Sequence, residues 1–125
     1  MTDAVTLVIP ASTEHVQLAR LVASGIAGRL AFDLDEIEDL RIAVDELCVL
    51  LLEHGASESL SLAYEVVDEA TLLVRGTARV DAGTAPPEIS LLTAQILSTV
   101  ADAHDLGVDG DGTAYFTLRK TRQHA

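Results

Sequence analysis

The chain of 125 residues has few of the residues that often stabilise small proteins. It contains no Trp, two Phe, two Tyr and a single cysteine, Cys48. One cysteine cannot form an internal disulfide, and Cys48 lies in an apolar run, so we expect it to belong to the core. Hydrophobic residues make up 49% of the chain and aromatic residues only 3%. This composition predicts a single domain over residues 1–125 with an aliphatic core.

Basic residues are also scarce. Eight Lys and Arg stand against 20 Asp and Glu, so the formal net charge is −12. A chain of this charge repels phosphate backbones, which argues against nucleic-acid binding and favours a basic protein partner. The N-terminus lacks the pattern of a signal peptide, and the apolar run at 47–52 is too short to span a bilayer. We therefore expect a cytoplasmic protein with no membrane segment.

Hydrophobic periodicity predicts five strands and three helices. Alternating or β-branched runs place the strands at residues 4–9, 59–67, 71–80, 104–108 and 113–121. Apolar residues that recur every three or four positions place the helices at about 13–30, 34–54 and 88–102. The last of these helices is expected to bury Ile89, Leu92, Ile96, Leu97 and Val100.

Capping and turn residues define how these elements connect. Ser12 or Thr13 can cap the first helix, Asp33 and Glu36 form a capping pair for the second, and Gly55 suits its left-handed end. Turns near 68–69 and 109–112 predict two hairpins, so the sheet should be mostly antiparallel. The expected fold class is α+β, a two-layer sandwich with three helices on one face of the sheet.

The segment DLRIAVDELCVLLLEHG (39–55) is the most specific part of the sequence. Together with the order of elements, it resembles the GHKL, or Bergerat-fold, ATPases, and most of all the small anti-sigma factors that are also serine kinases. The resemblance covers nearly the whole chain, including LVIPASTEHVQLARLVASGIAGRL near the start and DGDGTAYFTLRKT near the end. It implies a histidine-kinase-ATPase-like fold and a role in transcription regulation.

In that family the second helix carries a Glu-x-x-x-Asn motif. The Glu orients or deprotonates the attacking group, and the Asn holds the magnesium ion that bridges the ATP phosphates. Residues four apart lie on one helix face, so both side chains can reach the same ligand. Glu46 matches the catalytic Glu, whereas Leu50 stands at the Asn position and offers no oxygen to a hard cation. We expect an inactive site and no metal.

The other two nucleotide motifs of the family are incomplete. Its adenine motif, Asp-x-Gly-x-Gly, aligns by strand register with Gly76 at the Asp position and Ala78 at the first glycine. Asp81 and Gly83, slightly further on, match only the first half of the motif and are the candidate cofactor-binding residues. The Gly-rich phosphate turn aligns with residues 90–93, which contain no glycine. The resemblance therefore predicts no ATP or magnesium cofactor here.

Arg20 is the candidate partner-binding residue. In the resembling anti-sigma factors, an Arg in a similar setting on the first helix contacts the sigma factor and its antagonist, and Arg is frequent at interface hot spots. Asp45 is interpreted as a solvated charge on a helix face, and His54 as a favourable partner of the helix dipole. Lys120 and Arg122 are expected at the exposed end of an edge strand.

The leading hypothesis is an anti-sigma-factor-like module that binds a sigma factor or related partner, is antagonised by an anti-anti-sigma protein, and has no kinase activity. It is expected to be a homodimer that buries part of residues 4–22. One alternative is an ATP- and magnesium-dependent serine-protein kinase that acts on an anti-anti-sigma factor, with Glu46 as base. A further alternative is a domain of this fold that binds another protein or a small ligand. Leu50 and the missing glycines argue against the kinase, and nothing in the sequence separates the first hypothesis from the third.

Overall fold

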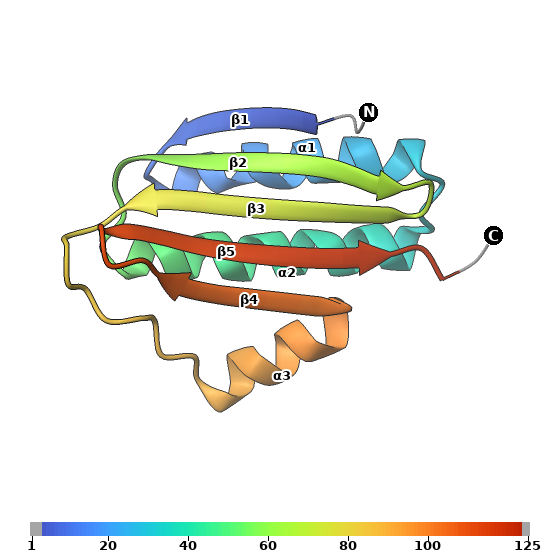
Figure 1. Ribbon diagram of the computed structural model, residues 1–125. Helices are drawn as coiled ribbons and strands as arrows, with labels where there is room; N and C mark the ends of the chain where they lie inside the picture. The colour runs from blue at the N-terminus through green and yellow to red at the C-terminus, as the bar shows by residue number, and fades with distance from the viewer. Residues whose placement is uncertain (1–3, 124–125) are drawn as a thin grey trace.

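The computed structural model describes residues 4–123 (Figure 1). Its elements are β1 (Ala4–Pro10), a 3₁₀ turn (Thr13–His15), α1 (Val16–Arg29), α2 (Leu34–Glu53), β2 (Ser57–Asp68), β3 (Thr71–Arg79), α3 (Leu91–Val100), β4 (Ala103–Val108) and β5 (Thr113–Thr121). The order predicted from the sequence is confirmed, and the 3₁₀ turn before α1 is the one addition.

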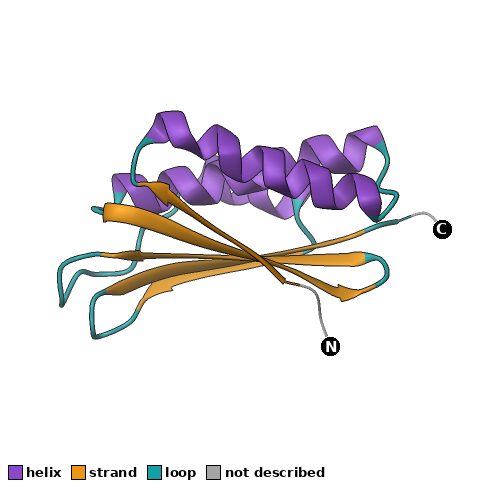
Figure 2. Cartoon of the chain, turned by 90° about the horizontal axis from the view of Figure 1, so that it is seen from above, coloured by secondary structure: helices purple, strands orange, loops and turns teal. Residues whose placement is uncertain are grey.

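The five strands form a single sheet with the order β1-β2-β3-β5-β4. Every neighbouring pair of strands is antiparallel. The three helices cover one face of this sheet and leave the other face open (Figure 2). The predicted α+β sandwich is therefore confirmed. The strands β1 and β4 form the two edges.

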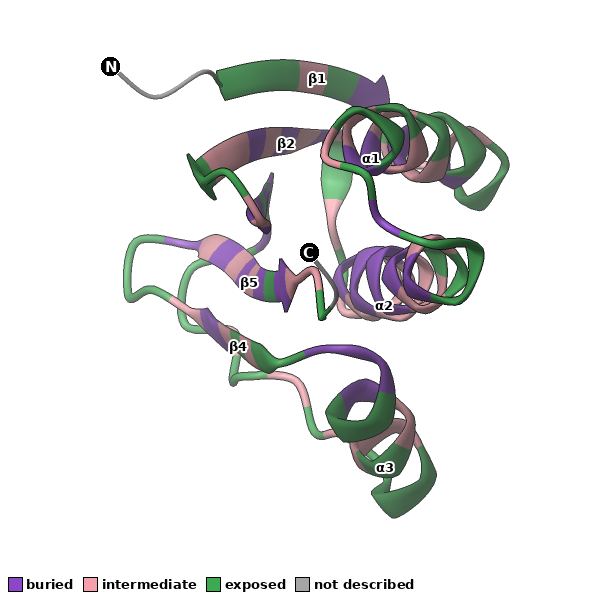
Figure 3. Ribbon diagram, turned by 90° about the vertical axis from the view of Figure 1, so that its right-hand side faces the viewer, coloured by how far each residue is buried: buried purple, intermediate pink, exposed green. Residues whose placement is uncertain are grey.

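The core lies between the helices and the covered face of the sheet (Figure 3). Leu47 and Leu51 of α2 are fully buried. Leu62 of β2 and Phe116 of β5 are each only 1% exposed. Gly76 on β3 makes room for the Phe116 ring, because an added Cβ would lie only 2.2 Å from it. Among residues 4–123, no helix is long and apolar enough to cross a bilayer.

Local hydrogen bonds determine where the helices begin and end. The Asp33 carboxylate accepts from the Glu36 N–H at 2.8 Å, and the Glu36 carboxylate accepts from the Asp33 N–H at 2.9 Å. This predicted capping box contributes about 1 kcal/mol to the start of α2. Gly55 follows α2 with a φ of +98°. The predicted cap of the first helix is wrong, because the Ser12 side chain forms no capping bond and Thr13 belongs to the 3₁₀ turn.

The end of β5 is attached to the start of α2. Lys120 is only 6% exposed, and its ammonium group lies 3.6 Å from the Asp39 carboxylate. The Arg122 guanidinium donates to the Leu30 carbonyl oxygen, and the Gln123 N–H donates to the Glu36 carboxylate. The prediction of an exposed edge strand for Lys120 and Arg122 is therefore wrong, since β5 lies between β3 and β4.

Candidate functional site

One side of α2 faces α3 across a shallow groove. Ile42 and Glu46, one helical turn apart, line the α2 wall, and Leu92, Gln95, Ile96, Thr99 and Val100 line the α3 wall. The groove is therefore mainly aliphatic. The Glu46 carboxylate forms no ion pair within the described part of the chain. A carboxylate at the position of the family base is thus present, but no charged group orients it.

Leu50 continues the row of Ile42 and Glu46 by one further turn of α2. Its side chain is partly buried and packs against the core. The position that bears a magnesium-binding amide in the resembling family therefore presents methyl groups, which cannot coordinate a cation that needs oxygen ligands. Leu50 thus does not supply the oxygen ligand that a magnesium-bridged ATP would need at this position. Within residues 4–123, no three His, Cys, Asp or Glu side chains are placed to hold a metal ion.

The loop between β3 and α3 contains Asp81 and Gly83. A bond of 3.1 Å from the Thr84 N–H to the Asp81 carbonyl oxygen closes a turn, and Gly83 supplies the positive φ of +85° that this turn uses. Asp81 is exposed and does not line the groove that Glu46 lines. The structure therefore does not bring Asp81 and Gly83 into one site with Glu46.

His54 holds this loop against the end of α2. Its Nε2 atom is in hydrogen-bond contact with the Ala85 carbonyl oxygen. Sequence reasoning missed this contact, because the two residues are 31 positions apart and the loop carries no periodic pattern. The one hint in the sequence was the position of His54, a side chain able to form hydrogen bonds at the C-terminal end of α2.

The Ser90 side chain caps the N-terminus of α3. The Ser90 hydroxyl oxygen accepts from the Thr93 N–H at 3.1 Å, and the Ser90 hydroxyl group lies 3.0 Å from the Thr93 hydroxyl. One of the amide donors that could bind a phosphate is therefore already occupied. Leu91 and Leu92 beside it are 78% and 68% exposed. The predicted start at residue 88 and the predicted burial of Leu92 are wrong, because the Ser90 cap starts α3 and its packing face is formed by Leu97 and Val100.

The opposite side of α2 faces α1 and is polar. The Arg20 guanidinium of α1 lies 3.0 Å from the Asp45 carboxylate of α2, and both side chains are partly exposed. Glu38, Arg41 and Ile42 complete the surface around this pair. The Nε atom of Arg20 is buried and has no hydrogen-bond partner in the described chain. The interpretation of Asp45 as a freely solvated charge is wrong, because the packing of α1 on α2 brings it to Arg20.

Cys48 lies one turn beyond Asp45 and is completely buried. Burial and, to a smaller extent, the Asp45 carboxylate raise the pKa of its thiol to about 12, against the opposing effect of the Arg20 guanidinium. The thiol therefore stays protonated and unreactive at neutral pH. The prediction that Cys48 belongs to the core is confirmed.

Comparison with known proteins identifies the family. Residues 9–107 match the family model described as the histidine kinase-like ATPase domain. The chain belongs to this family, and the resemblance to GHKL ATPases is confirmed.

Two bacterial serine-protein kinases are similar to part of the chain. The chain is 43% identical to the serine-protein kinase RsbW of Bacillus subtilis over 56 residues, which are 45% of this chain and 35% of that protein. It is 35% identical to the RsbW of Halalkalibacterium halodurans over 69 residues, 54% of this chain and 43% of that protein. The matched region thus spans less than half of these relatives.

A solved structure has the same fold. It contains the RsbU and RsbW domains of Rv1364c from Mycobacterium tuberculosis, and it aligns with a TM-score of 0.69 and 14% identity. The alignment covers 98% of this chain and 34% of that one. At 14% identity, this similarity shows a shared fold and nothing about activity.

Proposed function

We propose that the chain is a cytoplasmic, anti-sigma-type regulatory module that sequesters a sigma factor or a related partner and transfers no phosphate. The observation that carries this proposal is Leu50, which places an aliphatic side chain one turn beyond Glu46 on the α3 side of α2. The Ser90 cap on α3 supports it, because a bound phosphate would have to compete with this hydroxyl group for the Thr93 amide. The similar proteins named serine-protein kinases are enzymes by name. We propose that this chain differs from them because it lacks the residues that bind the nucleotide.

Arg20 is the proposed centre of the partner surface. Asp45 holds the guanidinium through one nitrogen, Nη1, at the partly exposed boundary between α1 and α2. An ion pair of this exposure contributes only about 0–1 kcal/mol to folding. Its main effect is then to fix the direction of the Arg20 side chain, which lowers the entropy lost when a carboxylate of a partner binds.

A separate surface supports a homodimer. Val5 and Val8 on the edge strand β1, and Leu18 and Leu21 on α1, are between 45% and 60% exposed. These residues are half of the eight large hydrophobic residues that are most exposed within residues 4–123, and all four fall in the predicted interface of 4–22. Exposed aliphatic side chains beside an unpaired strand edge favour self-association.

The test uses the sigma factors and anti-anti-sigma proteins of the source organism, purified one at a time. Biolayer interferometry should find a sigma factor that binds the chain, and an anti-anti-sigma protein should displace it. Intact-mass spectrometry after incubation with ATP and magnesium should find no added phosphate on either protein. A phosphorylated anti-anti-sigma protein would establish the kinase, and the absence of binding to every member of both panels would favour a different ligand.

A further inference from the structure

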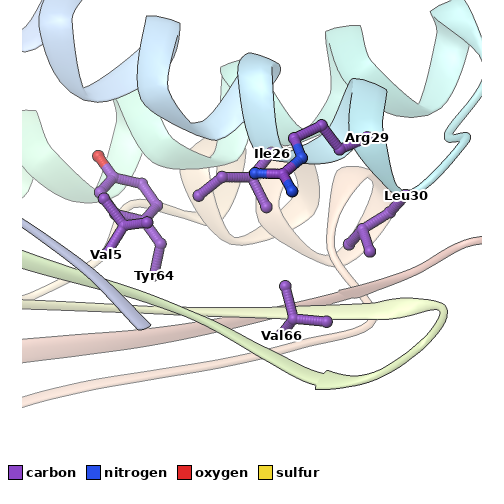
Figure 4. A pocket seen from close by; sticks show the side chains of 6 residues that line it. All are labelled: Val5, Ile26, Arg29, Leu30, Tyr64 and Val66. Atoms are coloured by element: carbon purple, nitrogen blue, oxygen red, sulfur yellow. The ribbon is translucent and has the colours of Figure 1, made fainter. Parts of the chain in front are cut away.

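A pocket lies between the end of α1, the edge strand β1 and the neighbouring strand β2. It is lined by Val5, Ile26, Arg29, Leu30, Tyr64 and Val66 (Figure 4). Its volume is about 200 Å³. Four of these six residues are aliphatic, and the Tyr64 hydroxyl group is already engaged, since it donates to the Ala19 carbonyl oxygen at 2.9 Å. The walls of the pocket therefore favour an apolar group.

Arg29 is the exception among the lining residues. Figure 4 shows its side chain leaving α1 with the guanidinium group among Ile26, Leu30 and Val66. Arg29 forms no ion pair with any described residue, and no acidic residue lines the pocket. In a chain with 20 acidic residues, a guanidinium group directed at aliphatic side chains is available for an anion from outside.

A second guanidinium group lies at this end of α1. Arg122 donates to the carbonyl oxygen of Leu30, the residue that follows α1 and lines the pocket. The carbonyl end of a helix repels anions, and a cation bound to it reduces this repulsion. Arg122 does not line the pocket, so Arg29 is the one cation among the described lining residues.

We infer that this pocket binds a small monocarboxylate whose apolar body enters the aliphatic part while its carboxylate pairs with Arg29. Size limits the ligand, because an apolar cavity of about 150 Å³ holds a benzene molecule. A pocket of about 200 Å³ therefore suits a phenyl ring or a short alkyl chain, and benzoate and hexanoate are the appropriate probes. Drug-sized ligands need a pocket of roughly 300 Å³ or more. This site is distinct from the Glu46 groove and does not depend on the proposed function.

The test is a titration of the ¹⁵N-labelled full chain with hexanoate, followed by two-dimensional NMR. The amides of Ile26, Leu30 and Val66 should show saturable shifts. An Arg29→Gln variant should bind about tenfold more weakly or worse, since it loses a charge-assisted contact. The matched control is Arg75→Gln, which removes an exposed guanidinium group of β3 that does not line the pocket, and it should bind as the wild type does.

Two further titrations separate the contributions of shape and charge. Hexanamide, which has the same body without the charge, should bind about tenfold more weakly than hexanoate. A Val66→Phe variant, which fills the pocket, should lose the hexanoate shifts and keep its far-ultraviolet circular dichroism. The inference would be overturned if Arg29→Gln and Arg75→Gln lost the same affinity for hexanoate, or if hexanamide bound as tightly as hexanoate. It would also be overturned if hexanoate caused no saturable shifts. Val5 also lies in the proposed dimer segment, so sedimentation of the same samples tests the dimer separately.

Discussion

Asp45 and Glu46 are adjacent in α2, and the structure gives them opposite surroundings. Asp45 faces α1 and pairs with Arg20 at 3.0 Å, whereas Glu46 faces α3 across a groove with aliphatic walls. Successive residues of a helix point about 100° apart, so one helix can present two different surfaces. The paired charges of Arg20 and Asp45 lie on the α1 side. On the α3 side, where the nucleotide chemistry of the resembling family is expected, Glu46 forms no ion pair with any residue of 4–123.

The same contrast extends along α2. Glu38 and Arg41 continue the polar side and lie 3.5 Å apart as an exposed ion pair. On the other side, Ile42 lines the groove together with the exposed Leu92 of α3, and Leu50 lies one turn beyond Glu46. This contrast between the two sides of α2 is the basis of the proposal that the chain binds a protein partner and not ATP.

The largest effect is expected on the polar side. Replacing Arg20 with Ala should weaken binding of the sequestered sigma factor by about 2 kcal/mol or more, roughly 30-fold, as for an interface hot spot. The matched control Arg75→Ala removes an exposed guanidinium group of β3 that lies outside this surface, and it should change the affinity less than about threefold. Biolayer interferometry measures both. Equal losses in the two variants would show that overall charge, and not Arg20 itself, controls binding.

On the aliphatic side, Leu50→Asn restores the amide of the family motif. We expect it to lower the free energy of unfolding by about 1–3 kcal/mol, because a polar group is placed in a partly buried apolar environment. Leu50→Met should cost less, since it conserves volume and polarity. Urea unfolding of both variants checks this. A more stable Leu50→Asn variant would mean that the groove accommodates polar groups.

A smaller effect is expected for the ion pair itself. Asp45→Asn should lower the free energy of unfolding by at most about 1 kcal/mol, and the loss should shrink at high salt. Glu46→Gln is the matched variant one position later. It should change stability by less than about 0.5 kcal/mol, because the Glu46 carboxylate forms no ion pair within residues 4–123. Thermal unfolding at low and high salt compares them. A larger loss for Glu46→Gln than for Asp45→Asn would reverse the comparison.

Near neutral pH the smallest expected effect, the absence of a reaction, concerns Cys48, one turn from Asp45 on α2. Because burial raises its pKa from 9.0 to about 12, its contribution to stability is complete below about pH 9 and is lost as the pH rises toward 12. At pH 8 iodoacetamide should not modify the folded chain, whereas the chain in urea should react. Mass spectrometry of the alkylated protein measures this, and rapid modification without urea would show that the α1 side of α2 opens.

The sequence was sufficient for the order of elements, because the strand alternation, the Asp33–Glu36 capping box and Gly55 act through neighbours in the chain. It was insufficient where distant segments meet. Arg20 and Asp45 are 25 residues apart, and only the packing of α1 on α2 brings them together. Lys120 was misplaced for a similar reason, since its burial follows from the position of β5 inside the sheet.

The candidate site shows the same limit. Glu46 and Leu50 could be assigned to one face of a helix from their spacing, and the structure places them on one row of α2. The roles assigned to Glu46, Arg20, Asp81 and Gly83 stay predictions, as do the homodimer and the partners. The Ser90 cap could have been found from the sequence, because Ser before a helical pattern is a common N-cap, but the Pro86-Pro87 pair favoured an earlier start.

Isothermal titration calorimetry of the chain with ATP and magnesium tests the central claim most directly. A micromolar site corresponds to about 8 kcal/mol, and each lost charge-assisted contact removes roughly 1.5–3 kcal/mol. With the magnesium ligand replaced by Leu50 and no glycine-rich phosphate turn at 90–93, we predict no measurable binding at sub-millimolar nucleotide. Micromolar binding that disappears in a Glu46→Ala variant would contradict the account and establish a working nucleotide site.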